Sequence, residues 1–145
     1  MKSKSCFFIG HREAPESIYP ELAQTVEQLI EQGVTDFYVG HYGNFDRLAA
    51  RAVIAAKRQH PEMRLTLLLP YHPAEREVIL SSGFDGSLYP PGMEEVPRRL
   101  AIPRANRWMV EQCIHLVAYV THPASNARKV VEWGRKLRKA VRIII

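Results

Sequence analysis

The sequence is poor in cysteine and has no long hydrophobic run. Its 145 residues include two cysteines, Cys6 and Cys113, and no Cys-x-x-Cys spacing, which argues against a zinc knuckle or a redox dithiol. No apolar run approaches the length that crosses a bilayer. The basic start Met1–Ser5 leads into Cys6–Ile9, an apolar run that is too short for the core of a signal peptide. We therefore expect a cytoplasmic protein without a membrane partner.

Internal repeats, low-complexity tracts and linker-like segments are also lacking. Hydrophobic residues make up 46% and charged residues 24% of the chain, close to the globular average, so a folded domain is expected rather than disorder. A chain of this length can bury a sizeable core without disulfides. Residues 1–145 are therefore expected to form a single domain, which the pattern of strands and helices indicates to be Rossmann-like.

Acidic residues are in short supply. The chain has 20 Lys and Arg against 15 Asp and Glu, which gives a formal charge of +5. The excess is greatest near the C-terminus, where Glu132 is the single acidic residue between positions 128 and 142. Two interpretations stay open: a solvated last helix, or contact with nucleic acid. The basic residues that could make this contact are Arg135, Lys136, Arg138 and Lys139.

Short apolar runs alternate with segments of helical periodicity along the whole chain. The runs predict strands at 6–9, 36–39, 65–69, 114–120 and 141–145. The periodic segments predict helices at about 18–32, 45–59, 104–112 and 127–139, with a short helix at 74–80 and a surface excursion at 83–97. This alternation predicts an α/β fold, a three-layer doubly wound Rossmann-like domain with about five parallel strands in the order 3-2-1-4-5.

Glycines and polar residues gather directly after the predicted strands, at the edge of the sheet where such folds bind ligands. Four of the six histidines lie in these loops. Arg104 and Asn106 open the helix before the fourth strand, where a surface role and a ligand role are both open. The candidate ligand-binding residues are Gly10, His11, Arg12, Gly40, His41, Gly43, Asn44, Asp46, Tyr71, Arg104, Asn106, Ser125 and Asn126.

Three interpretations of this edge compete. The glycines and the helix N-termini favour an anion such as a phosphate, and Arg12 would add a charged donor. Histidines with Asp46 or Glu75 could instead bind a divalent metal, but no His-x-x-x-His spacing preorganises such a site, so no metal is predicted. The histidines could also merely end strands. Asn44 is a candidate N-cap of the second helix.

Several segments taken together resemble the SLOG superfamily of Rossmann-like proteins, which includes DprA/Smf, Lonely-Guy and YpsA-like proteins. The resemblance covers nearly the whole chain and looks closest to the YpsA-like branch. It implies a nucleotide-type ligand held by the glycine loop after the second strand. The segments that carry it are Phe8–Arg12, Gly40–Asp46, Pro70–Tyr71 and Asn106–Val110.

The sequence also departs from the family pattern. His41 stands where the loop usually has its second glycine, and Ala105 stands where an arginine is usual. Pro123–Asn126 lacks the paired glycines and the glutamate of the Lonely-Guy phosphoribohydrolases. These losses argue against that catalysis and leave the catalytic residues unassigned.

The leading hypothesis is a domain that binds or senses a nucleotide or nucleotide derivative, with the phosphate at the strand-end glycine loops. No catalytic role and no cofactor are indicated. The alternatives are a nucleotide-processing hydrolase with Asp46 or a histidine as general base, and a DprA-like binder of single-stranded nucleic acid. Self-association is common in the family, and the region of Trp108 and Trp133 could support a homo-oligomer.

Overall fold

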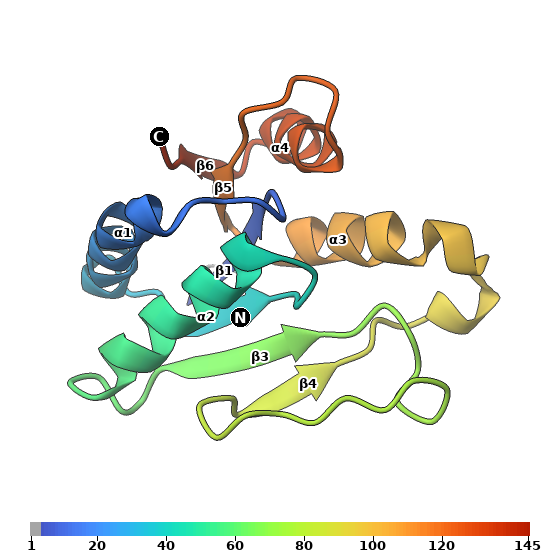
Figure 1. The fold of residues 1–145 in the computed structure, drawn as a ribbon, viewed down its shortest axis with the longest axis horizontal. Helices are drawn as coiled ribbons and strands as arrows, with labels where there is room; N and C mark the ends of the chain where they lie inside the picture. Colours follow the sequence, from blue (N-terminus) through green and yellow to red (C-terminus); the bar gives the residue numbers. More distant parts are fainter. Residues whose placement is uncertain (1–3) are drawn as a thin grey trace.

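The computed structural model describes residues 4–145, so the first part of the basic start, residues 1–3, lies outside the described residues (Figure 1). All five predicted strands are found. Each is a short apolar segment that ends at or near a glycine, a proline or a polar residue. Their bounds are β1 Ser5–Gly10, β2 Asp36–Val39, β3 Arg64–Leu68, β5 His115–Tyr119 and β6 Ala140–Ile143.

The strands form one six-stranded sheet in the order β4-β3-β2-β1-β5-β6, and every neighbouring pair is parallel. The predicted order of the five strands is confirmed. The sixth strand, β4 (Gly86–Leu88), adds outside β3 at the lower edge of the sheet in Figure 1, within the segment predicted to be a surface excursion.

Polar contacts help to hold β4 in place, beside the packing of Leu88 against the core. The Asp85 carboxylate accepts hydrogen bonds from the backbone N–H of Leu65 at 2.8 Å and from Lys57 Nζ at 2.6 Å. Lys57 Nζ also donates to the carbonyl of Gly83. A strand of three residues with one apolar side chain leaves no periodic signal, which is why the sequence pattern missed it.

Four long helices cover the two faces of the sheet, which confirms the three layers. The helices α1 and α2 contact each other on one face, and α3 and α4 contact each other on the other. Strand β1 separates the two halves of the core, because Phe8 packs with the α1–α2 side and Phe7 with the α3–α4 side. The helices span α1 Tyr19–Glu31, α2 Asn44–Lys57, α3 Ala101–Gln112 and α4 Asn126–Lys136.

The helix at 74–80 was predicted wrongly, since this segment contains neither helix nor strand. Val78 and Leu80 pack against the core, whereas Ile79 between them is 89% exposed. Alternation of buried and exposed side chains belongs to extended backbone, so three apolar neighbours gave a false helical signal.

Helix ends agree with the sequence in part. Pro20 lies in the first turn of α1, and Gly33, with a φ of +97°, follows its end as expected. Helix α3 starts at Ala101, three residues earlier than predicted. Helix α4 ends at Lys136, and two residues later Arg138 takes a left-handed φ of +61°.

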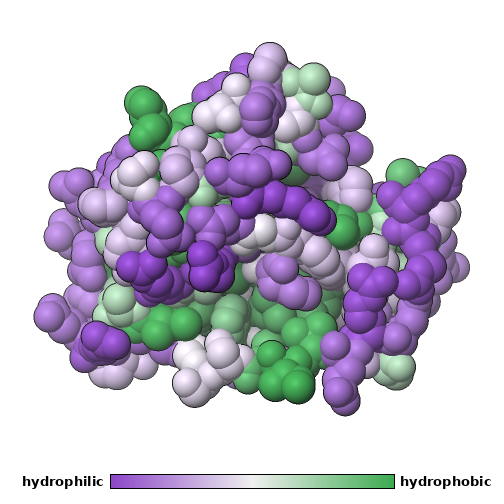
Figure 2. Space-filling view, in the orientation of Figure 1, coloured by the Kyte–Doolittle hydropathy of each residue, from purple (hydrophilic) through white to green (hydrophobic). Residues whose placement is uncertain are grey.

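The face drawn in Figure 2 is mostly hydrophilic; hydrophobic residues appear in its lower part, around β3 and β4, and at the upper left, where the chain ends. No helix within residues 4–145 is long and apolar enough to cross a membrane.

Candidate functional site

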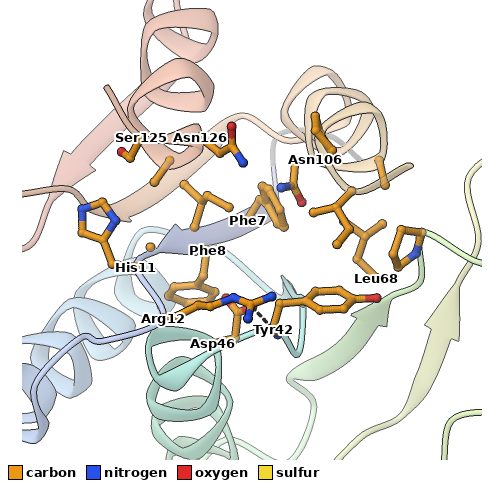
Figure 3. A pocket seen from close by; sticks show the side chains of 18 of the residues that line it. Phe7, Phe8, His11, Arg12, Tyr42, Asp46, Leu68, Asn106, Ser125 and Asn126 are labelled. Carbon is orange, nitrogen blue, oxygen red and sulfur yellow. Dashed lines mark hydrogen bonds between the residues drawn. The ribbon is translucent and has the colours of Figure 1, made fainter. Parts of the chain in front are cut away.

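A cavity of about 470 Å³ opens at the carboxyl ends of β1, β2, β3 and β5 (Figure 3). Its size is within the range of small-molecule sites. It lies where the strand order reverses, because β1 stands between β2 and β5. Nine of the thirteen predicted residues line it: Gly10, His11, Arg12, Gly40, Asp46, Tyr71, Asn106, Ser125 and Asn126.

His11 joins the loop after β1 to the loop after β5. Its ring nitrogen Nε2 accepts hydrogen bonds from the backbone N–H groups of Thr121, at 2.7 Å, and His122, at 3.3 Å. Burial, and then the neighbouring His122 ring, lower the pKa of His11 below its usual value. A neutral imidazole with a free Nε2 lone pair suits this acceptor role. His11 therefore holds one wall of the cavity together.

Asp46 brings a carboxylate into the cavity from the first turn of α2. Its Oδ2 accepts a hydrogen bond from the backbone N–H of Tyr42 at 3.1 Å. Burial raises the pKa of Asp46 to about 6, and this hydrogen bond offsets only part of the effect. Near neutral pH the group is close to its titration range, which is where a general base works best.

The loop between β2 and α2 is closed by contacts with the loop after β1. Gly43, and not Asn44, is the N-cap of α2, so the prediction for Asn44 as the cap was wrong. The Asn44 backbone N–H donates to the Arg12 carbonyl, and its side-chain amide donates to the Ala14 carbonyl. A Cβ on Gly43 would lie 2.5 Å from the Arg12 Cα, so the glycine makes room for a crossing loop.

Four predicted residues do not line the cavity. Gly43 and Asn44 lie behind it, at the contact with the loop after β1. His41 is exposed, and its ring packs beside Tyr42 with the centroids 4.5 Å apart. Arg104 lines a separate hollow on the outer side of α3, together with Trp108 and Glu111.

The start of α4 forms the opposite wall. Ser125 is the N-cap, and its hydroxyl accepts a hydrogen bond from the backbone N–H of Arg128 at 3.1 Å. Ser125, Asn126 and Ala127 all line the cavity, and the first turn of α4 carries no acidic residue. Figure 3 shows Ser125, Asn126 and Asn106 along one side of the cavity and Arg12, Asp46 and Tyr42 along the other.

The sequence pattern missed two arginines. Arg98 and Arg99 lie in a 3₁₀ helix just before α3, and both line the cavity. Arg98 pairs with Glu75 and lies over the Tyr71 ring, 5.2 Å from its centroid. Arg99 and Arg12 make no ion pair or side-chain hydrogen bond with any residue in 4–145. Two adjacent arginines ahead of a helix are a sequence feature of a possible anion site. The sequence did not show that they face the cavity, because they directly follow the segment predicted to run over the surface.

Metal ligands do not gather here. Within residues 4–145 no three histidine, cysteine, aspartate or glutamate side chains are placed to hold a metal ion. His11 uses Nε2 for the loop contact already described, and His72 Nδ1 accepts from the backbone N–H of Ala74.

The basic C-terminal residues lie apart from the cavity. Lys136 is 5.8 Å from the centroid of the Trp133 ring, and Lys139 Nζ donates to the Glu111 carbonyl. Arg135 and Arg138 are exposed. Arg135 and Lys136 lie in the last turn of α4, and Arg138 and Lys139 follow its end. None of the four forms an ion pair with an acidic side chain within the described chain.

Fold and cavity together define a Rossmann-like α/β protein with a mixed apolar and polar pocket at the strand ends, lined in part by arginines. Sequence comparison finds no matching protein-family model and no matching curated protein. Solved structures do match. The chain is similar to DNA processing protein A (DprA) from Streptococcus pneumoniae, at 16% identity and a TM-score of 0.70, with 98% of this chain and 50% of that one covered.

A second similar structure is DprA from Helicobacter pylori, described for its single-stranded DNA binding mode. The identity is 15% and the TM-score 0.68, with 98% of this chain and 65% of that one covered. The chain thus spans about half to two thirds of the DprA chains that it matches. This likeness shows the fold, which DprA shares with the SLOG group. The YpsA-like branch stays a prediction.

Proposed function

We propose that this domain binds a nucleotide or nucleotide derivative in the strand-end cavity. The observation that carries the proposal is the pair of cavity-lining guanidiniums, Arg12 and Arg99, that no carboxylate within residues 4–145 neutralises. Both side chains and the N-terminus of α4 line the same cavity. An anionic group is the ligand part that such a setting stabilises.

The phosphate is best placed at the α4 end of the cavity. At the α2 end, the ionised Asp46 would repel it, and the Arg12 carbonyl already takes the Asn44 N–H. At the α4 end, Ser125 and Asn126 add neutral hydrogen-bonding groups. The sugar and base would then extend toward Tyr42 and Tyr71, where aromatic rings offer stacking surface.

Calorimetric titration with AMP, ADP and ADP-ribose tests this proposal. We expect at least one to bind, and we expect Arg99→Ala to weaken that binding about 10- to 100-fold, the value of a charge-assisted hydrogen bond. Arg58→Ala is the matched control, because it removes the same charge from the exposed end of α2. Equal binding by both variants would overturn the site, and no binding by the wild-type protein would overturn the function.

Single-stranded nucleic acid is a second candidate, favoured by the fold of DprA, since the Helicobacter pylori protein binds single-stranded DNA. Here the basic residues in the last turn of α4 and just after it would contact phosphates. Binding to an oligo-dT strand should then fall steeply with salt, and replacing Arg135, Lys136, Arg138 and Lys139 by alanine should flatten that dependence. An unchanged salt slope would remove this candidate.

Hydrolysis is a third candidate, favoured by one observation, the pKa of about 6 for Asp46 in the cavity. If Asp46 acts as a general base, turnover of a bound nucleotide should rise with pH through 6, and Asp46→Asn should abolish it. Chromatography of each binding nucleotide after long incubation provides the readout. Unaltered nucleotide throughout would leave binding as the only function of the cavity.

A further inference from the structure

A second hollow adjoins the strand-end cavity. It is a groove of about 360 Å³ between α3 and α4. Pro103, Asn106 and Asn126 line both the groove and the cavity. The two spaces therefore meet at the pair of asparagines, which Figure 3 shows on the same side of the cavity. A ligand that fills the cavity has a direct path into the groove.

The groove carries positive charge that internal pairs leave unused. Arg107, Lys129 and Lys136 line it, against the single acid Glu132. Glu132 is already paired with Arg128 at 3.4 Å. No carboxylate within residues 4–145 forms an ion pair with any of the three basic side chains. The charge of the groove thus suits an anionic group such as a phosphate.

An aromatic surface lies in the same groove. The Arg107 guanidinium lies over the Trp133 ring, 3.7 Å from its centroid. Trp133 Nε1 is buried and has no hydrogen-bond partner within the described chain. A buried N–H without an acceptor is unfavourable. A flat ring with acceptor atoms could stack on the Arg107–Trp133 pair, as nucleobases do on aromatic and guanidinium planes.

We propose that the groove is a second nucleotide subsite. The ligand class is then two nucleotide units joined through phosphate, with one unit in the strand-end cavity and the second base at Arg107 and Trp133. Lys129 and Arg107 would neutralise the linking phosphate. This inference rests on the proposed function, because the first unit occupies the cavity described above. The linkage can be a phosphodiester or a pyrophosphate.

Calorimetry with three probes tests the subsite: AMP, the 5′-phosphorylated deoxyadenosine dinucleotide (phosphodiester-linked) and diadenosine diphosphate (pyrophosphate-linked). We expect one of the two-unit probes to bind at least about tenfold tighter than AMP, the gain of one stacked base. The better probe identifies the linkage. Arg107→Ala and Trp133→Leu should each reduce that gain and leave the affinity for AMP unchanged. The control Arg58→Ala should leave the affinity for all three probes unchanged.

A fluorescence titration tests the same subsite without changing it. The sequence has two tryptophans, so Trp108→Phe leaves Trp133 as the only indole emitter. The better two-unit probe should change this emission, and AMP should not.

The outcomes separate the two proposals. If AMP binds but neither two-unit probe binds more tightly, or if the groove variants keep the gain, the second subsite is wrong and the nucleotide cavity stands. If neither AMP nor a two-unit probe binds, the proposed function fails, and the subsite fails with it.

Discussion

The N-termini of α2 and α4 both lie at the same edge of the sheet, but they differ in the loop before the helix and in the charge of its first turn. Helix α2 begins after a glycine-rich loop and carries Asp46 in its first turn. Helix α4 begins after a loop without glycine and carries no acid in its first turn. The positive end of a helix stabilises an anion only where no carboxylate is already present. Under the proposed function we therefore expect the phosphate at the N-terminus of α4, the helix that follows the loop without glycine.

This difference shows that a glycine after a strand need not mark a phosphate cradle. Gly43 allows the backbone of Arg12 to pass at close range, and Gly10 allows the Phe45 ring to pack against β1, since a Cβ there would lie 2.3 Å from it. Both glycines serve contacts inside the protein. Their value lies in holding the cavity walls in position.

The largest effect is expected from Gly43→Ala. The φ of Gly43 is 175°, which any residue adopts, so the cost comes from the clash with the Arg12 backbone alone. We expect a loss of about 3 kcal/mol in the free energy of unfolding, at the upper end for overpacking. Urea denaturation measures it. Gly86→Ala is the control, because nothing lies within 4 Å of a Cβ there. A loss equal to that of the control would contradict the crossing-loop account.

Asp46→Asn should stabilise the protein at neutral pH. The folded-state pKa of about 6 lies above the ordinary value of 3.8 for an aspartate, so the folded state loses stability as pH rises from about 4 to 6. The neutral amide of asparagine does not lose this stability, so we expect a gain in the free energy of unfolding of about 3 kcal/mol at pH 8 and of little at pH 3.5. Unfolding curves at both values provide the test.

Asp85→Asn is the matched control for Asp46→Asn, with the opposite sign expected. The pKa of Asp85 is lowered despite its desolvation, because the Lys57 and Leu65 contacts outweigh it. Its replacement should destabilise the protein at neutral pH. If Asp46→Asn, like Asp85→Asn, fails to stabilise the protein, the Asp46 carboxylate is well solvated in the folded state.

His11→Gln should reduce the sensitivity of the protein to acid. The pKa of His11 is lowered in the folded state, so the unfolded chain takes up the proton first and stability falls as pH drops below 6.5. Protonation of Nε2 removes its two hydrogen bonds from the loop after β5, each worth about 1 kcal/mol. The loss in the free energy of unfolding between pH 7.5 and pH 5 should be smaller in the variant than in the wild-type protein. An equal loss in both would mean that His41 and His115, whose pKa values are also lowered, cause the acid sensitivity.

Ser125→Ala should have the smallest effect. It removes the cap of α4 at a cost of about 1 kcal/mol. Ser125→Asn retains a capping oxygen and should recover most of it. Thermal denaturation of both variants measures the difference. If Ser125→Ala is neutral, the α4 terminus is held by other contacts.

Much of this architecture could be predicted from the sequence. Runs such as Cys6–Ile9 and Asp36–Val39 are buried strands because they are short and apolar, and the crossover rule then gives the parallel order. The strand-end rule then indicated where a cavity would form, and nine of the predicted residues line it.

The remainder depends on contacts between distant segments. Arg98 and Arg99 line the cavity because the segment after β4 returns to it, and β4 itself is held by Asp85 and Lys57. Such polar contacts leave no periodic pattern. The closed α2 terminus was equally hidden, because the Arg12 carbonyl that occupies it lies 32 positions away in the chain.

The most direct test of the phosphate position is a backbone amide NMR titration with AMP. Our account predicts the largest chemical-shift changes at Asn126 and Ala127, at the start of α4, with smaller changes at Asn44 and Phe45. The opposite pattern, with the largest changes in the Gly43–Phe45 turn, would place the phosphate on the glycine loop and contradict the account.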